Sequence, residues 1–265
     1  MMIDLYHYSL LSIFLVGLAV VLIAGEIGWQ LGGRAEGRGR ENIATLEAAV
    51  LGLLALIIGF TFAMALARFE ARRDAVVNEA TAIGTTALRA RLLPEPQRSE
   101  TLKLLRDYVQ TRLDIVERGL SLTEHPAVVD RSNVLQEALW QQAKAMAARD
   151  TTTVPTGLFI EALNQMIDSQ GKRLAALRNH IPNSVQLSLF WIAAIASAFA
   201  GYASGLETRR TRLPVYVLAL VVCAVLVLIL DLDRPTAGFI KVSEQPMIDT
   251  GASMAGSLIR RDGAS

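Results

Sequence analysis

The side chains of this sequence that could carry out chemistry are few and widely spaced. Asp231 and Asp233 lie two residues apart at the end of an apolar run. Hard cations such as Ca²⁺ take about six to eight oxygen ligands, so two carboxylates fall far short of a complete site. We therefore favour a helix-stop role for this pair over a metal site.

Signals of catalysis are missing from the sequence. The three histidines, His7, His125 and His180, fall in different elements without the spacing of metal ligands. No glycine-rich phosphate loop precedes a Lys-Ser or Lys-Thr pair, and no nucleophile elbow occurs. The single cysteine, Cys223, lies in an apolar run, so the chain can form neither an internal disulfide nor a thiolate cluster. We expect no enzymatic activity and no cofactor.

The composition indicates a membrane protein. Of the 265 residues 52% are hydrophobic and only 19% are charged, and the apolar residues are gathered in blocks. Crossing a hydrocarbon core roughly 30 Å thick takes about 20 apolar residues. Four blocks reach that length: 5–24, 45–66, 187–205 and 213–230. The first lacks a signal-peptide cleavage site, so we expect it to be retained. A net charge of +1 argues against nucleic acid as a partner and leaves the lipid bilayer.

The residues between the second and third blocks have an ordinary soluble composition and the periodicity of helices. One apolar stripe, through Val76, Ala80 and Ile83, runs until Pro94. The sequence therefore predicts an all-α integral membrane protein, with four transmembrane helices and a helical extramembrane bundle inserted between the second and third. The expected division is 1–66 for transmembrane helices one and two, 67–186 for the bundle, 187–235 for transmembrane helices three and four, and 236–265 for a C-terminal tail.

Two charged residues stand where apolar blocks end. Glu26 follows the first block, and the favoured interpretation is an interfacial carboxylate. The alternative is a pairing role with a basic residue on another helix, because a partly buried carboxylate is costly to leave unpaired. Arg68, after the second block, is the other candidate for a structural or pairing role. Around Glu26 a small-residue face, Gly25, Gly28 and Gly32, would admit another helix backbone.

The second block carries a stripe of apolar and small residues at helical spacing: Gly52, Leu56, Phe60, Ala63 and Ala67. Spacing alone favours a helix packed inside a four-helix bundle. The alternative is a ring of apolar side chains around a symmetry axis, a constriction that gates by losing its water.

This second block also carries a family resemblance. Residues 53–69, LLALIIGFTFAMALARF, resemble the second membrane helix of bestrophins, in which a Gly-Phe pair is followed at the same distance by an arginine and an aromatic residue. The wider pattern is more similar to the bacterial bestrophin-like family of unknown function, and it covers most of the chain. The matching stretches are 78–85 (NEATAIGT), 88–90, 92–94, 201–203 (GYA), 230–235 (LDLDRP) and 238–240 (GFI).

Bestrophins are pentameric anion channels, so the resemblance implies a homo-oligomer, a pentamer, that passes chloride or other small anions. Phe60, Leu56 and Gly52 would line its narrow neck. Gly52 offers no side chain where a bulky apolar residue is expected, so the constriction would be shorter or wider. The calcium-binding acidic cluster of animal bestrophins is reduced to Asp231 and Asp233, which weakens the case for calcium gating. The alternative function is a non-conducting membrane scaffold or sensor that signals through the helical bundle.

We expect the protein in the bacterial inner (plasma) membrane, but the basic residues disagree about its orientation. By the positive-inside rule, the short-loop arginines place the termini and the insertion outside: Arg34, Arg38, Arg40, Arg209, Arg210 and Arg212. The resemblance and the residues that flank the insertion indicate the opposite: Arg68, Arg72, Arg73, Lys172, Arg173 and Arg178. The side of the membrane stays open at this point.

Overall fold

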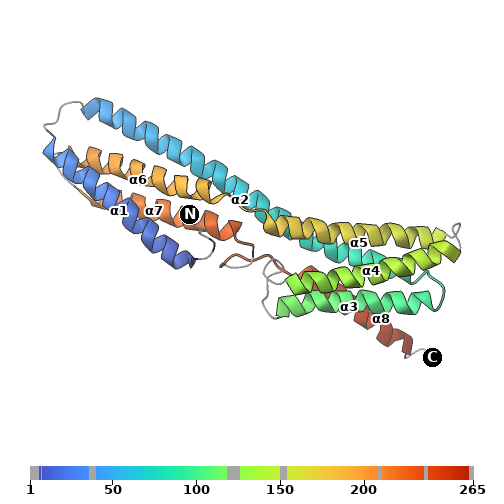
Figure 1. Ribbon diagram of the computed structural model, residues 1–265. Helices are drawn as coiled ribbons and strands as arrows, with labels where there is room; N and C mark the ends of the chain where they lie inside the picture. The colour runs from blue at the N-terminus through green and yellow to red at the C-terminus, as the bar shows by residue number, and fades with distance from the viewer. Residues whose placement is uncertain are drawn as a thin grey trace. The chain divides into compact units, whose positions relative to one another are not determined.

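The computed structural model describes residues 6, 8–35, 40–117, 126–149, 154–207, 211–235 and 238–262. Within these ranges the chain folds into eight α-helices joined by short connections (Figure 1). They are α1 (Leu10–Arg34), α2 (Arg40–Ala90), α3 (Gln97–Glu117), α4 (Pro126–Arg149), α5 (Val154–Arg178), α6 (Asn183–Gly205), α7 (Leu213–Asp233) and α8 (Gln245–Asp262). The expected all-α fold class is confirmed.

Four helical segments of the described chain are long and apolar enough to cross a membrane, as expected: Leu10–Arg34, Ile43–Ala90, Val154–Gly205 and Leu213–Asp233. The first begins later than the sequence predicted, because Ser9 caps it by accepting a hydrogen bond from the Ser12 N–H at 3.0 Å. The second continues without a break to Ala90, since no proline occurs in it before Pro94.

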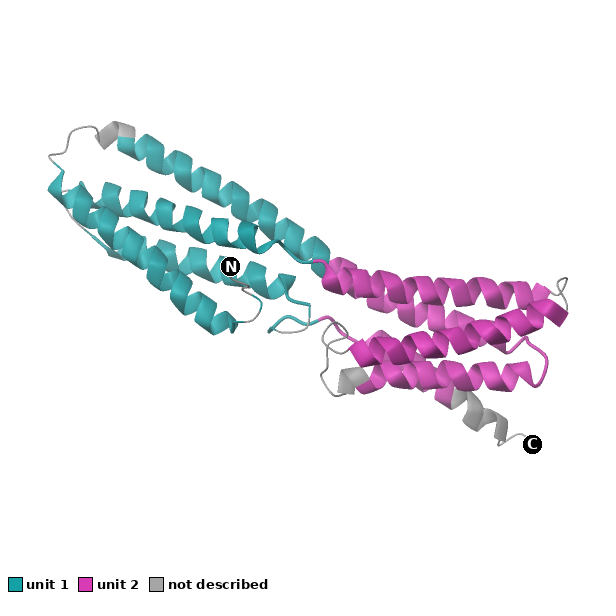
Figure 2. Cartoon of the chain, in the orientation of Figure 1, with its two compact units in different colours: residues 1–69, 180–241 teal, residues 70–179, 242–265 magenta. Residues whose placement is uncertain are grey.

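The chain forms two compact units (Figure 2). Unit 1 comprises residues 1–69 and 180–241, and unit 2 comprises residues 70–179 and 242–265. Unit 1 therefore holds α1, α6, α7 and the first part of α2. Unit 2 holds the remainder of α2 with α3, α4, α5 and α8.

In unit 1 the backbones of α1 and α6 touch. A Cβ atom added to Gly28 would lie 2.0 Å from the Ala198 carbonyl oxygen, and one added to Gly201 would lie 2.0 Å from the Gly25 carbonyl oxygen. Helices in a bilayer associate through such close van der Waals packing, because lipid offers no hydrophobic drive between them. The small-residue face expected around Glu26 is therefore the surface of α1 against which α6 packs.

The core of unit 1 joins these two helices to α7 and to one face of α2. Its apolar cluster includes the buried side chains of Val21, Leu54, Ala65, Leu189, Ala193, Cys223, Leu226 and Ile229. Cys223 is fully enclosed there. This core fixes which face of α2 is turned inward.

Unit 2 is a bundle with its own core, formed by residues such as Ile83, Leu105, Leu139, Phe159, Leu163 and Met166. The helix α8 lies where we predicted only a C-terminal tail, and it adds Met247 and Met254 to this core. Thr250 supports it by donating to the Pro246 carbonyl oxygen at 2.9 Å. Residues 242–262 thus form part of the folded bundle.

The contact between α1 and α6 generates the first prediction. Gly28→Ala places a methyl group against the α6 backbone, so we expect it to destabilise the protein by about 3 kcal/mol or more, the upper end of overpacking costs. Gly59→Ala is the matched control, because a Cβ at Gly59 meets nothing within 4 Å. Thermal unfolding in detergent compares the two variants, and equal midpoints would refute the contact.

Candidate pore helix and buried ionic anchors

The four neck candidates lie on the exposed side of α2. Leu56 is 55% exposed and Phe60 is 69% exposed in the single chain, and Gly52 and Ala63 are also exposed. Such exposure does not fit the interpretation favoured by spacing, in which this stripe packs inside the bundle of its own subunit. These side chains face either lipid or other subunits.

The inward side of α2 is a different stripe, formed by Leu54, Thr61 and Ala65. At 3.6 residues per turn, two positions along the helix amount to a rotation of about 200°, so Leu56 and Ala63 point away from the unit 1 core. Thr61 does not disturb the apolar core, because its hydroxyl donates to the Ile57 carbonyl oxygen at 2.7 Å. The helix therefore has a packed side and a free apolar side.

Arg68 continues the inward stripe and meets a buried carboxylate at the end of α7. Its Nη1 atom lies 3.5 Å from Asp233 Oδ1. Asp233 is fully buried and accepts the Ile181 N–H at 2.7 Å as well as the Tyr6 hydroxyl. Gln186 Nε2 in turn donates to the Tyr6 oxygen at 2.7 Å. A buried carboxylate needs such donors, and here they come from the chain before α6 and from Tyr6, four residues before α1. The Arg68 guanidinium of α2 adds an opposite charge.

Asp231, two residues earlier, holds a different segment. It accepts the N–H groups of Phe239 at 2.8 Å and Ile240 at 3.0 Å. Gly238 permits this approach: its φ of +147° suits glycine, and a Cβ there would lie 2.1 Å from Asp231 Oδ1. Both carboxylates thus bind protein donors, and the described residues contain no group of three His, Cys, Asp or Glu placed to hold a metal ion.

Glu26 lies beside Arg212, which directly precedes α7. The Arg212 Nη2 atom is 3.4 Å from Glu26 Oε1, and the same carboxylate accepts the Tyr216 hydroxyl at 3.1 Å and Gln30 Nε2 at 3.3 Å. The Arg212 guanidinium stacks on the Trp29 ring, 3.9 Å from its centroid. The geometry is that of the pairing alternative considered for Glu26.

Unit 2 contains an ionic cluster that the sequence analysis did not identify. Glu79 is fully buried in α2 and binds Arg112 at 2.8 Å, Arg173 at 2.7 Å and the Tyr108 hydroxyl at 2.9 Å. Arg173 also reaches Glu244, just before α8, at 2.6 Å. A signal was present: Glu79 falls between Val76 and Ile83 at helical spacing, so it shares the inward stripe.

The charge state of Glu79 follows from its neighbours. Burial by itself would raise the pKa of this carboxyl, but the Arg112 and Arg173 guanidiniums outweigh burial and hold the pKa below its ordinary value. Burial raises the pKa of the Tyr108 hydroxyl, which therefore stays protonated and donates to the carboxylate. The cluster therefore combines an ionised carboxylate and two guanidiniums with a neutral tyrosine hydroxyl, all shielded from water.

Other candidates are not brought together. His180 stacks edge-on against the Tyr6 ring at 4.9 Å, whereas His7 and His125 lie outside the described residues. Of the short-loop arginines, Arg38, Arg209 and Arg210 also lie outside them.

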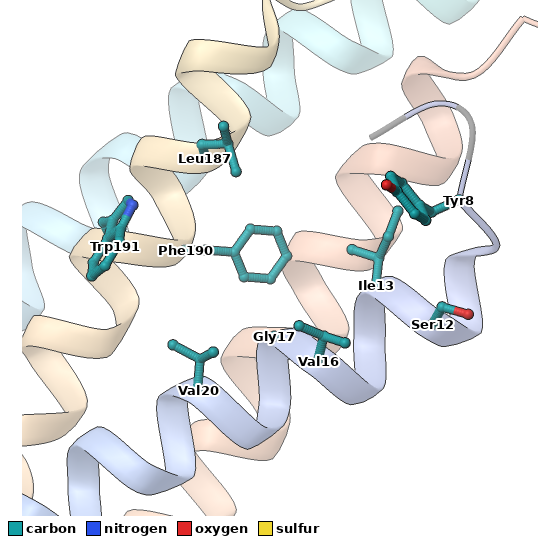
Figure 3. A pocket seen from close by; sticks show the side chains of 9 residues that line it. All are labelled: Tyr8, Ser12, Ile13, Val16, Gly17, Val20, Leu187, Phe190 and Trp191. Atoms are coloured by element: carbon teal, nitrogen blue, oxygen red, sulfur yellow. The ribbon is translucent and has the colours of Figure 1, made fainter. Parts of the chain in front are cut away.

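An apolar groove of about 400 Å³ lies between α1 and α6 (Figure 3). The Phe190 ring covers Gly17, where an added Cβ would come within 2.5 Å of a ring carbon. Among the described residues that line this groove only Ser12, Tyr8 and Trp191 carry polar groups, and none is charged. This lining therefore favours an apolar ligand over a charged one.

The Glu79 cluster generates the second prediction. Because the pKa of Glu79 is lower in the folded protein than its ordinary value of 4.5, ionised Glu79 stabilises unit 2 above pH 4.5, and this contribution is lost as the pH falls through the folded pKa. Glu79→Gln should cost about 3–5 kcal/mol at pH 7, the cost of breaking a buried pair, and should flatten the acid limb of the stability curve.

The control for that variant is Glu161→Gln, which breaks the exposed pair with Arg89 (3.2 Å). Exposed pairs contribute about 0–1 kcal/mol, so this variant should follow the wild type at every pH. Unfolding midpoints measured from about pH 3 to about pH 8 compare the three proteins. If both variants behave alike, the buried cluster does not stabilise unit 2 as described.

Comparisons with known proteins agree with this geometry. A family model described as the bestrophin-like domain matches residues 13–247. The crystal structure of a bacterial bestrophin homologue from Klebsiella pneumoniae superposes with a TM-score of 0.66 at 14% identity, covering 94% of this chain and 99% of that chain. A tryptophan-to-alanine variant of that homologue gives 0.69 at 14% identity, covering 93% and 99%. These structures show the same fold, and no curated protein matches the chain.

Proposed function

This chain belongs to the bestrophin-like family, and from that premise we propose that it is a subunit of a homo-oligomeric anion channel with its neck on α2. The oligomer is a pentamer, as in bestrophins, and the permeant ions are chloride or other small anions. The protein acts without a cofactor or enzymatic chemistry. Its membrane is the bacterial inner (plasma) membrane.

The observation that carries this proposal is the free apolar side of α2. Gly52, Leu56, Phe60 and Ala63 follow one another along that side and have no partner within the unit 1 core. In an assembly with α2 nearest the axis, the same side chains from every subunit form successive rings. Narrow apolar rings exclude ions when water leaves them, which is the action expected of a gate.

The rotation of α2 about its own axis supports the proposal. Leu54, Ala65 and Arg68 share the inward side, and Arg68 is held at Asp233. Turning the helix to hide Phe60 would remove Arg68 from a fully buried carboxylate, which is strongly unfavourable. The ionic contact therefore keeps the stripe outward.

The neck would consist mainly of two rings. Leu56 and Phe60 are four residues apart, or about 6 Å along the axis. Gly52 contributes no side chain one turn earlier, so that level is wide, and Ala63 adds only a methyl group one turn later. The apolar constriction is thus short.

Assembly is the third prediction. We expect protein purified in mild detergent to run as one defined oligomer, with a protein mass five times the 28.8 kDa of the chain. Light scattering that separates the detergent contribution gives this mass. A strictly monomeric mass across several detergents would rule out an axial pore.

The neck itself generates the fourth prediction. The double variant Leu56→Ala, Phe60→Ala should raise anion flux in reconstituted vesicles above the wild-type level, because shorter side chains let water return to the constriction. The control is Leu11→Ala, Leu15→Ala, which shortens two exposed leucines on α1 and should leave the flux unchanged.

Two results would contradict this function. Equal anion flux through both double variants would show that Leu56 and Phe60 of α2 do not form the neck. A folded, oligomeric neck variant no more conductive than empty vesicles, with the wild type equally silent under varied pH, calcium and voltage, would instead favour the non-conducting scaffold or sensor.

A further inference from the structure

A second groove in unit 1, of about 450 Å³, lies between α1 and α7. Its side walls are apolar and are formed by Leu18, Leu22 and Ile23 of α1 and by Leu220 of α7. Glu26, Arg212 and Tyr216 line one end of it. This groove therefore differs from the groove in Figure 3, whose described lining carries no charge.

The polar end is held in a fixed geometry. The Arg212 guanidinium stacks on Trp29 and contacts Glu26, and Tyr216 and Gln30 bind the same carboxylate. The Arg212 side chain is nevertheless 46% exposed. Arginine has five N–H donors, so stacking and a single carboxylate contact leave donors for an anion.

Depth in the membrane follows from the two helices. Arg212 directly precedes the apolar run of α7, so its guanidinium lies at the membrane boundary. Leu220 is eight residues further along α7, and Leu18 is eight residues before Glu26 on α1. At 1.5 Å per residue both walls extend about 12 Å from the polar end into the hydrocarbon.

We propose that this groove binds a glycerophospholipid, with the phosphodiester on Arg212 and one acyl chain along the apolar walls. Arginine forks match phosphate oxygens in charge and geometry. The start of α7 lies at the same place and lacks a side-chain cap in the described chain, so its first N–H groups add positive potential. The acyl chain of this lipid covers Ile23 and Leu220, which are otherwise exposed.

The bilayer location selects a lipid over a free anion. The walls occupy the depth at which acyl chains are the surrounding molecules, and a free phosphate would leave them uncovered. Glu26 balances the charge of Arg212 and keeps its guanidinium oriented, so the site recognises the phosphodiester and tolerates different headgroups beyond it.

Lipid titration of the purified, delipidated full-length protein, followed by native mass spectrometry, tests the proposal. The probes are dioleoyl phosphatidylglycerol, dioleoylglycerol, which has the same chains without phosphate, and inorganic phosphate. We expect a tight phosphatidylglycerol site for each subunit, and weaker binding of the other two probes. Arg212→Gln should weaken phosphatidylglycerol binding about tenfold or more, as loss of a charge-assisted hydrogen bond implies, whereas Arg212→Lys should weaken it less.

Two pairs of variants separate this site from general lipid contact. Arg34→Gln removes another exposed arginine from the end of α1, outside the groove, and should bind as the wild type does. Ile23→Trp fills the α1–α7 groove and should weaken binding, whereas Val16→Trp, in the groove of Figure 3, should not. The Trp pair decides the question if Arg212→Gln does not fold.

Three outcomes would overturn the proposal. One is equal phosphatidylglycerol affinity in folded Arg212→Gln and Arg34→Gln. Another is binding of dioleoylglycerol as tight as that of phosphatidylglycerol, which would mean that the phosphate is not recognised. The third is binding of inorganic phosphate as tight as that of the lipid, which would make this an anion site without an acyl-chain groove.

Discussion

A carboxylate buried away from water needs hydrogen-bond donors and an opposite charge, and this requirement determines which side of α2 faces inward in each unit. In unit 1 the carboxylate is Asp233 of α7, and α2 supplies Arg68. In unit 2 the roles are reversed: α2 carries the buried Glu79, and the arginines come from α3 and α5. Apolar packing tolerates small rotations of a helix, whereas separating a buried charge from its opposite charge is strongly unfavourable. The two ionic contacts therefore define the register of the longest helix in the described chain more narrowly than its apolar neighbours do.

The orientation of α2 about its own axis determines which of its side chains are left free to face lipid or other subunits. An apolar stripe on a membrane helix is ordinary, because lipid accepts apolar side chains anywhere on the surface. The stripe through Leu56 and Phe60 is distinguished by lying opposite a packed and ionically anchored side, within a chain of the bestrophin-like family. The backbone contact between α1 and α6 complements this arrangement: unit 1 holds three helices together by close packing and presents the fourth with one side open.

The sequence predicted those properties that depend on local composition. Apolar blocks of about 20 residues have few uses other than crossing a bilayer, so the spans and the fold class followed from them. The start of the first span was misplaced because the cap at Ser9 lies inside the apolar block. The helix α8 escaped notice because its buried positions, Met247 and Met254, are few and are separated by glycine, serine and threonine. Ionic partners such as Glu79 and Arg173 are 94 positions apart, and only the folded chain brings them together.

The cluster in unit 2 has an evolutionary consequence. Glu79 and Glu244 bring two negative charges and Arg112 and Arg173 bring two positive ones, so the charge of the cluster sums to zero. The Arg173 guanidinium pairs with both acids, of which Glu79 is buried and Glu244 is partly exposed. Replacing Glu79, Arg112 or Arg173 by an uncharged residue leaves the remaining buried charges unbalanced. Homologues that lose the cluster should therefore have exchanged its members together, and the transition between ionic and apolar versions of this bundle should require several simultaneous replacements.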